Sequence, residues 1–324
     1  MTLAVLADIG GTNTRVALAE GTQVRHDSIR RFANADYMAR GQDIAHVLRD
    51  YLALTGATVS SVCVAAAGPV QEGVATMTNL DWVIDAGKLS SATGARKLAI
   101  LNDLQAQGQA LGHIPAEKLR PVIDGPAKPG AAMLVVGLGT GVNAAPVHTG
   151  PGGRMVPPSE CGHVNMPVRT DEDLRLVRFV EALLTARSEV PHAGVEEVLA
   201  GRGLANLYAF AATESGRPST LTSAEVLSAL DAGDGVAAEA ARLYTHILGQ
   251  TLADLALIHL PYGGIFLIGG MSRAMTPHFA TCGLTAAFRE DRRVDLLQKD
   301  FSVTVVEDDY AALTGCAVYL AAMA

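Results

Sequence analysis

The chain has 324 residues, of which 49% are hydrophobic, and its formal net charge at pH 7 is −8. This length exceeds what one compact domain usually needs, so we expect two domains with a cleft between them, and the apolar content excludes global disorder. The acidic balance and the lack of any basic run of five residues argue against nucleic acid and anionic membrane surfaces as partners.

The four cysteines, Cys63, Cys161, Cys282 and Cys316, stand at wide and irregular spacings and form no CxxC pair. Such spacings favour buried thiols in a reducing compartment over disulfides or a zinc site. The first residues lack a basic leader, and no apolar run reaches about 18 residues. We therefore expect no signal peptide, no membrane-spanning helix and a cytoplasmic location.

Short apolar runs alternate with turns and helical patterns in the first third of the chain. Leu3–Ala7 predicts a buried strand that ends at Asp8 and a double glycine, and Arg15–Ala19 predicts a second strand. Gln23–Phe32 is a further candidate strand. The next predicted elements are a helix over 44–54, strands over 62–67 and 97–101, and a helix over 104–111.

A second round of strands begins at residue 133, after a connection rich in glycine and proline at 125–130. Met133–Val136 predicts a strand, Gly137–Gly141 a turn and Val142–Val147 another strand, as at residues 3–19. This repetition indicates a duplicated architecture. A loop is predicted at 151–158, followed by helices over 171–186, 203–212, 223–230, 236–259 and 310–322 and strands over 265–268 and 303–306.

The first glycine turn has the composition of a phosphate-binding loop. Gly10 and Gly11 allow backbone N–H groups to approach a phosphate, and Thr12 and Asn13 supply side-chain donors. Asp8 supplies a carboxylate suited to hydrated Mg²⁺. GxxxxGK[ST] is missing and GxGxxG is absent from this turn, which argues against P-loop and dinucleotide-binding folds.

Two further turns share this feature, because Gly137–Gly141 and Gly269-Gly270 also follow predicted buried strands. For each of the three turns an ordinary tight turn is the competing interpretation, since glycine after a strand is common in turns.

A polar pair, Asn102-Asp103, directly follows a predicted strand. The Asp103 carboxylate could act as a general base that removes a proton from an alcohol during phosphoryl transfer. Taken alone, the two residues favour a simpler interpretation, in which one of them caps the following helix.

A second polar group lies at Ser159–His163, where Glu160 and His163 could bind sugar hydroxyls. A solvated loop is the alternative, and the lack of HExxH and of nearby Cys or His partners argues against a metal site. Glu196 and Glu197, on a helical pattern, would by themselves predict a solvated face.

In their order along the chain, these motifs resemble those of the bacterial glucokinase family, within the superfamily of actin-like sugar kinases. The matching stretches cover nearly the whole chain and are ADIGGTNTR at 7–15, MTNLDW at 77–82, LNDL at 101–104, GLGTG at 137–141, SECGHV at 159–164, EEVLAGRGLANLY at 196–208, GGIFLIGGM at 263–271 and ALTGCAVYL at 312–320.

The resemblance implies an α/β, actin-like (ribonuclease H-like) sugar kinase fold with a duplicated βββαβα core. It implies a small α/β domain at 1–104 and 307–324 and a large helix-rich domain at 105–306 that close around the substrates. It further implies phosphorylation of glucose to glucose 6-phosphate by ATP, Mg²⁺ as cofactor and a homodimer.

The resemblance also implies roles for single residues. Asp103 is the catalytic base, and Asp8 reaches Mg²⁺ through water. The sugar is bound by Asn79, Asn102, Asp103, Glu160, His163 and Glu196. ATP is bound by Ala7, Asp8, Ile9, Gly10, Gly11, Thr12 and Asn13, by Gly137, Gly139, Thr140 and Gly141, and by Gly269 and Gly270.

Two stretches depart from the family pattern. Similar enzymes usually have GEGGH where this chain has Ser159-Glu160-Cys161-Gly162-His163, and Leu-Gly where it has Val142-Asn143. A kinase for mannose or an amino sugar is therefore an alternative. The alternative from another class is a non-catalytic sugar-sensing regulator, for which we would expect a DNA-binding helix pair ahead of the loop at Asp8.

Overall fold

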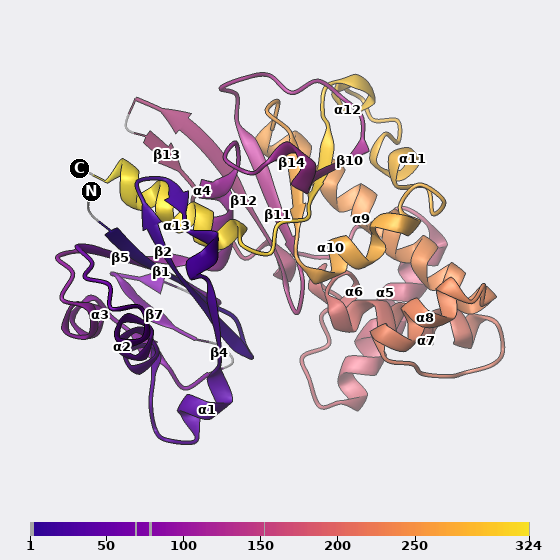
Figure 1. Ribbon diagram of the computed structural model, residues 1–324. Coiled ribbons are helices and arrows are strands. Elements are labelled where there is room, and N and C mark those ends of the chain that lie inside the picture. Colours follow the sequence, from indigo (N-terminus) through magenta and orange to yellow (C-terminus); the bar gives the residue numbers. More distant parts are fainter. Residues whose placement is uncertain (1–2, 69, 78–79, 152, 324) are drawn as a thin grey trace. The chain divides into compact units, whose positions relative to one another are not determined.

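A computed structural model describes residues 3–68, 70–77, 80–151 and 153–323 (Figure 1). Asn79, one of the predicted sugar-binding residues, lies outside the described residues. The chain divides into two compact units: unit 1 contains residues 1–116, 150–158 and 308–324, and unit 2 contains residues 117–149 and 159–307. Each unit has a mixed β-sheet covered by helices, so the α/β prediction is confirmed.

Unit 1 is built on a twisted sheet whose central strands are almost continuously buried, as expected where helices cover both faces. Its order is β3-β2-β1-β5-β9, with β4 paired to β2. The strands are β1 (Leu3–Ile9), β2 (Asn13–Glu20), β3 (Gln23–Val24), β4 (Arg30–Ala33), β5 (Ser61–Ala66) and β9 (Lys97–Asn102). β1 and β2 are antiparallel, whereas β1, β5 and β9 are parallel.

One strand prediction in this unit was wrong. Gln23–Phe32 is two short strands, β3 and β4, separated by a 3₁₀ turn at His26–Ser28. Ser28 Oγ accepts a hydrogen bond of 2.9 Å from Leu18 N, so a side chain replaces the backbone partner that a continuous strand would have supplied.

The strand period of two sends alternate side chains of β1 into two separate cores. Val5, Ala7 and Ile9 enter a core that also contains residues of α2, while Ala4 and Leu6 enter a core shared with α13. In Figure 1, α2 and α3 accordingly lie on one face of this sheet and α4 and α13 on the other.

The helices of unit 1 are α1 (Asn34–Met38), α2 (Ile44–Thr55), α3 (Ala86–Thr93), α4 (Asp103–Ala110) and α13 (Ala311–Ala322). A small sheet of β6 (Val70–Gln71), β7 (Val74–Thr76) and β8 (Val83–Ile84) follows β5. The predicted loop at 151–158 was partly wrong, since it contains the short strand β13 (Gly153–Met155).

Unit 2 repeats the strand arrangement of unit 1. β11 (Met133–Leu138) and β12 (Val142–Gly150) are antiparallel, and β11 is followed in the sheet by the parallel strands β14 (Ile265–Ile268) and β15 (Val303–Val306). β10 (Leu119–Ile123) pairs with β15. The order β2-β1-β5-β9 thus has its counterpart in β12-β11-β14-β15, as a duplicated core predicts.

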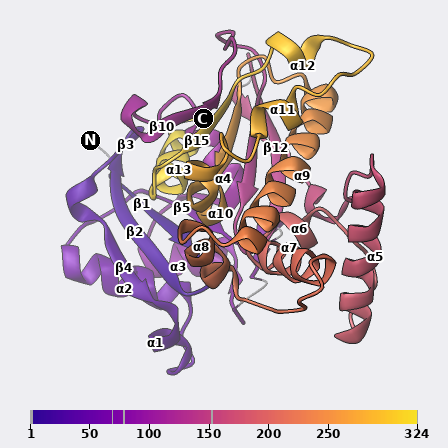
Figure 2. The ribbon, with the colours of Figure 1, turned by 90° about the vertical axis from the view of Figure 1, so that its right-hand side faces the viewer.

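One large hydrophobic core joins this sheet to the helices of unit 2. The longest helix, α9, packs against α7 and α11 (Figure 2). The helices are α5 (Asp171–Ala186), α6 (Glu196–Leu199), α7 (Gly201–Glu214), α8 (Ser223–Asp231), α9 (Gly235–His259), α10 (Gly270–Met275), α11 (Leu284–Phe288) and α12 (Leu296–Lys299), with 3₁₀ turns at Ala116–Lys118, Cys161–His163 and Thr276–His278. Throughout the described part of the chain, every helix is too short or too polar to cross a membrane.

The approach of α13 to α4 depends on a glycine. A Cβ atom placed on Gly315 would stand 1.6 Å from the carbonyl oxygen of Ala106 in α4. α4, which begins at Asp103, therefore packs against α13 at a contact that any larger residue at position 315 would break.

We expect Gly315→Ala to lower the free energy of unfolding by about 1–3 kcal/mol or more, because the new methyl group forces the two helices apart. Urea unfolding at equilibrium measures this. Gly235→Ala is the matched control: its Cβ would meet nothing within 4 Å at the start of α9, so no loss is expected. Equal stability of the two variants would contradict this account of the α4–α13 contact.

Candidate active site

The carboxyl ends of β1, β5 and β9 place Asp8 and Asp103 at the same edge of the unit 1 sheet. Asp8 pairs in register with Ala65, and Asn102, the last residue of β9, pairs with Ala66. Asp103 is the next residue and begins α4. Parallel strands present their carboxyl ends together, which is where open α/β sheets bind ligands.

The Asp103 carboxyl group has an unusual proton affinity. Burial raises its pKa to about 6, and the nearby negative charge of Asp8 raises it too, although Asp103 Oδ1 also accepts a hydrogen bond of 2.8 Å from Leu104 N. A carboxylate with a pKa near the working pH is better matched to proton transfer than an ordinary aspartate.

Asp8 carries its own partner. Arg15 Nη1 lies 3.1 Å from Asp8 Oδ2, and the Asp8 side chain is 14% exposed. Burial raises the pKa of Asp8, while the charge of Arg15 opposes this rise. The pair keeps one positive charge beside the two acidic groups.

Asn102 is the cap of α4. Its Oδ1 accepts hydrogen bonds from Leu104 N at 2.9 Å and Gln105 N at 3.3 Å, and Gln105 Oε1 accepts one from Asn102 N. The capping interpretation drawn from the residues alone is therefore correct for Asn102. Its Nδ2 donates to the carbonyl of Gly68, so this side chain also ties β9 to the segment after β5.

The first glycine turn is held from beneath by a buried asparagine. Asn34, 1% exposed, donates from Nδ2 to Gly10 O and from its backbone N to Thr12 O, at 2.8 and 2.9 Å. Its Oδ1 accepts from the buried Thr14 hydroxyl at 2.8 Å. Gly11 and Thr12 remain exposed at the tip, so the turn is rigid and its backbone can still meet a ligand.

In unit 2 the second and third glycine turns also share one sheet edge. Gly137 of β11 pairs in register with Ile268 of β14, and Gly269 follows. Gly269 has a φ of 100°, and a Cβ there would stand 2.3 Å from Leu138 O, so glycine is required. The turn Gly139–Gly141 is closed by a hydrogen bond of 3.0 Å from Gly139 N to Gly141 O.

Glu196 is bonded directly to the strand that leaves the second turn. Its Oε2 accepts from Val142 N at 2.8 Å and lies against Gly141 and Gly162. Its Oε1 accepts from Arg202 Nη2 at 2.7 Å. Glu196 is thus a partly buried, oriented carboxylate rather than part of a solvated face, contrary to the interpretation that helical spacing alone favours.

Arg202 connects these groups. It donates to both Glu196 and Glu197 and, from Nη1, to the carbonyl of Thr140 at 3.3 Å. Hydrogen bonds and charges of Glu197 and Glu196 raise the pKa of Arg202 above its ordinary value. Arg202 was not singled out from the sequence, because its contact with Thr140 spans 62 positions; Asn34 was missed for the same reason.

Glu160 and His163 lie in an exposed turn of unit 2. Glu160 precedes the 3₁₀ turn Cys161–His163, and its carbonyl accepts a hydrogen bond of 3.1 Å from His163 N. Each unit therefore holds part of the predicted site: Ala7–Asn13, Asn102 and Asp103 in unit 1, and Gly137–Gly141, Glu160, His163, Glu196 and Gly269-Gly270 in unit 2.

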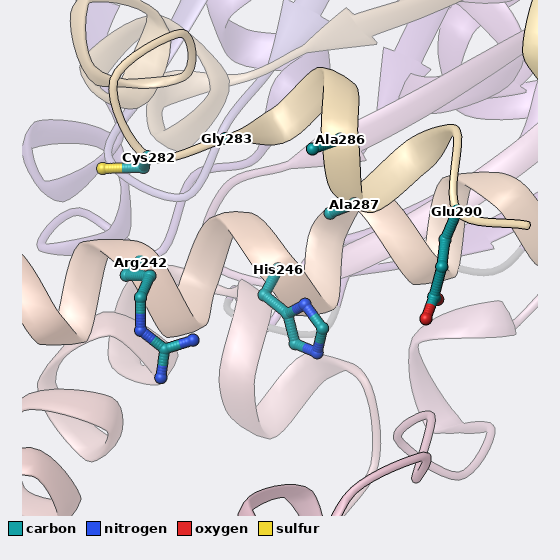
Figure 3. Close-up of a pocket in the computed structure, with 7 residues that line it drawn as sticks. All are labelled: Arg242, His246, Cys282, Gly283, Ala286, Ala287 and Glu290. Carbon is teal, nitrogen blue, oxygen red and sulfur yellow. The ribbon is translucent and has the colours of Figure 1, made fainter.

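A separate cavity of about 340 Å³ lies in unit 2 between α9 and α11 (Figure 3). Arg242 and His246 of α9 line one side, and Cys282 and Glu290 flank α11 on the other. Arg242 is already paired with Glu172 and Glu239, at 2.7 and 2.6 Å. None of the predicted site residues lines this cavity.

Comparison with known proteins gives a consistent result. A family model described as Glucokinase matches residues 5–323. A glucokinase of Mesorhizobium japonicum is 31% identical over 319 residues, which is 97% of this chain and 90% of the relative.

Solved structures agree. A glucokinase from an Antarctic psychrotroph has a TM-score of 0.86 at 27% identity and covers 99% of both chains. A ROK family glucokinase from Streptomyces griseus, in complex with glucose and AMPPNP, has a TM-score of 0.65 at 19% identity over 97% of this chain and 98% of its own.

We expect Asp103 to titrate with a pKa of about 6 in the folded protein, because of burial and the Asp8 charge. Carboxyl ¹³C NMR, with the resonance assigned through Asp103→Asn, measures this value directly. Asp8→Asn should lower the pKa of Asp103, since it removes a like charge. Titration of Asp103 at the ordinary aspartate value in the native protein would contradict the proposed environment.

Proposed function

The chain belongs to the glucokinase family, whose reaction is the phosphorylation of glucose by ATP, and we propose that Asp103 is the general base of this reaction. Asp103 would take the proton of the sugar 6-hydroxyl as that oxygen bonds to the γ-phosphorus and ADP leaves with the bridging oxygen. The observation that carries this assignment is the position of Asp103 directly after β9, at the same sheet edge as Asp8 and the first glycine turn, where burial raises its pKa to about 6.

We assign the remaining hydroxyls of the sugar to polar side chains of both units. Asn79 and Asn102 serve from unit 1, and Glu160, His163 and Glu196 serve from unit 2. Carboxylates, imidazole and amides match sugar hydroxyls because each hydroxyl both donates and accepts. The support is strongest for Glu196, whose carboxylate is oriented by Val142 N and Arg202.

ATP would be held by the three glycine turns, with the first turn stiffened by Asn34 and the second by Gly201 N and Arg202. Mg²⁺, when bound with ATP, would neutralise phosphate charge. Among the described residues, no group of three His, Cys, Asp or Glu side chains could cage a metal ion. Asp8, which would reach the ion through water, fits an ion that is carried mainly by phosphates and water.

The same proposal requires both units to act on one sugar and one ATP, as a small domain (1–104 and 307–324) and a large domain (105–306) would. A homodimer in the cytoplasm, without nucleic acid or membrane as partner, completes the proposal. Its support is the family and the acidic charge of −8.

Another hexose, such as mannose or an amino sugar, is the alternative to glucose as the preferred substrate. Asn143 and Ser159 stand where the family pattern has glycines. Ser159 Oγ, next to Glu160, donates a hydrogen bond of 2.8 Å to Asn143 Oδ1. Phosphorylation rates for glucose, mannose and glucosamine, measured by coupled ADP release, decide which hexose is the preferred substrate. If another hexose is phosphorylated as fast as glucose or faster, glucose is not the preferred substrate.

We expect Asp103→Ala to reduce kcat by about a hundredfold or more, because it removes the proton acceptor, while the KM values for glucose and ATP change little. Asp36→Asn, an exposed aspartate of α1, is the control and should retain full activity. A near-normal kcat in Asp103→Ala would remove Asp103 from the mechanism.

We expect Asn34→Ala to raise the KM for ATP about tenfold or more, because the first turn loses two side-chain hydrogen bonds at 2.8 Å. The KM for glucose should change much less. Thr14→Val, which removes only one of these bonds, should give a smaller change in the same direction. A larger effect on glucose than on ATP would show that this turn does not bind the nucleotide.

A further inference from the structure

Asn143 departs from the family pattern and is the second residue of β12, immediately after the second glycine turn. Its side-chain amide contacts the turn that carries Glu160. Asn143 Oδ1 accepts hydrogen bonds from Ser159 Oγ at 2.8 Å and from Cys161 N at 3.2 Å. Asn143 Nδ2 donates to the carbonyl of Ser159.

These hydrogen bonds hold the residues on both sides of Glu160 in the chain. The residue before it and the residue after it are each bonded to the same asparagine, while the Glu160 side chain stays exposed. The Glu160 backbone, with φ −128° and ψ 45°, belongs to neither a helix nor a strand. No repeating ladder holds this backbone, so the side chain of Asn143 takes over that task.

Three consecutive residues thus organise three parts of the predicted site in unit 2. Gly141 ends the second glycine turn, Val142 N binds Glu196 at 2.8 Å, and Asn143 binds the chain on both sides of Glu160. A shift of the Glu160 turn relative to β12 would therefore change the spacing between the two glutamates and the turn Gly139–Gly141.

Ser159, the second departure from the family pattern, is a hydrogen-bond partner of Asn143, the first. Ser159 replaces a glycine of the family pattern, and its hydroxyl lies within hydrogen-bond reach of Asn143 Oδ1 and of the Ala144 carbonyl. Its single proton can serve one acceptor at a time. Glycine at both positions would supply none of these side-chain hydrogen bonds, so Asn143 and Ser159 together form a contact that the family pattern lacks.

We propose that Asn143, together with Ser159, is a positioning residue that holds Glu160 in place against β12 and thereby sets the affinity of this protein for its hexose. This inference rests on the proposed role of Glu160 in binding the sugar. Asn143 itself acts on the protein backbone rather than on the reacting atoms.

The test is a set of steady-state measurements on Asn143→Gly, Ser159→Ala and the double variant. Asn143→Gly loses the three hydrogen bonds to the Glu160 turn, so the KM for glucose should rise about tenfold or more, with kcat and the KM for ATP within about twofold. Ser159→Ala loses one bond and should raise the glucose KM about threefold. The double variant should resemble Asn143→Gly, because the two side chains share a bond.

A second arm separates positioning from general stability. In a Glu160→Gln background, where the sugar contact is already weakened, Asn143→Gly should add at most about a twofold further rise in glucose KM. Ser228→Ala, which removes another hydroxyl bonded to a backbone carbonyl in unit 2, is the matched control and should leave both KM values unchanged. The thermal midpoint of each variant checks that it is folded.

An unchanged glucose KM in both Asn143→Gly and Ser159→Ala would overturn the inference and leave the proposed function standing. Full additivity of Asn143→Gly with Glu160→Gln would also overturn it, because Asn143 would then act elsewhere. If Glu160→Gln alone leaves the glucose KM unchanged, the assignment of Glu160 fails and the inference falls with it. Lack of ATP-dependent hexose phosphorylation by the unmodified protein would instead refute the proposed function.

Discussion

The burial of Asp103 at a sheet edge, beside the Asp8 carboxylate, is the constraint on which the proposed chemistry of unit 1 depends. Two negative charges at one sheet edge are tolerated only if one of them is neutral or paired. Arg15 pairs with Asp8, at 3.1 Å, and opposes the rise that burial causes in the pKa of Asp8, whereas burial and the Asp8 charge raise the pKa of Asp103 to about 6. Their positions follow from strand register, because Asp8 and Asn102 pair with neighbouring residues of β5.

Much of this geometry could be predicted from the sequence because it is local. β1, β5 and β9 are short apolar runs, polar residues stand at the ends of β1 and β9, and parallel strands bring such ends together. The duplicated strand–turn–strand pattern was equally visible, since each copy lies within one short stretch, residues 3–19 and 133–147. The proposed role of Asp103 as general base came from the family resemblance, because the residues alone favoured a helix cap.

What could not be predicted is the set of contacts between distant segments. Asn34 reaches Gly10 across 24 positions, and Arg202 reaches Thr140 across 62. Nothing in the composition around either residue distinguishes it from a surface polar residue. The failed strand at Gln23–Phe32 has a related cause, because Ser28 Oγ accepts a hydrogen bond from the distant Leu18 N where the backbone turns. Side-chain bonds to the backbone compete with strand pairing and leave no periodic signal.

Each unit pairs the acidic residue nearest its glycine turn with an arginine, Asp8 with Arg15 and Glu196 with Arg202. A carboxylate beside an anion-binding turn is unfavourable by roughly 4 kcal/mol per charge at 4 Å in a partly buried setting. A guanidinium in contact with the carboxylate offsets that repulsion, and in unit 2 Arg202 also binds the turn itself through Thr140 O. The arginines therefore permit carboxylates, which suit sugar hydroxyls, to stand next to the turns that we propose bind phosphate.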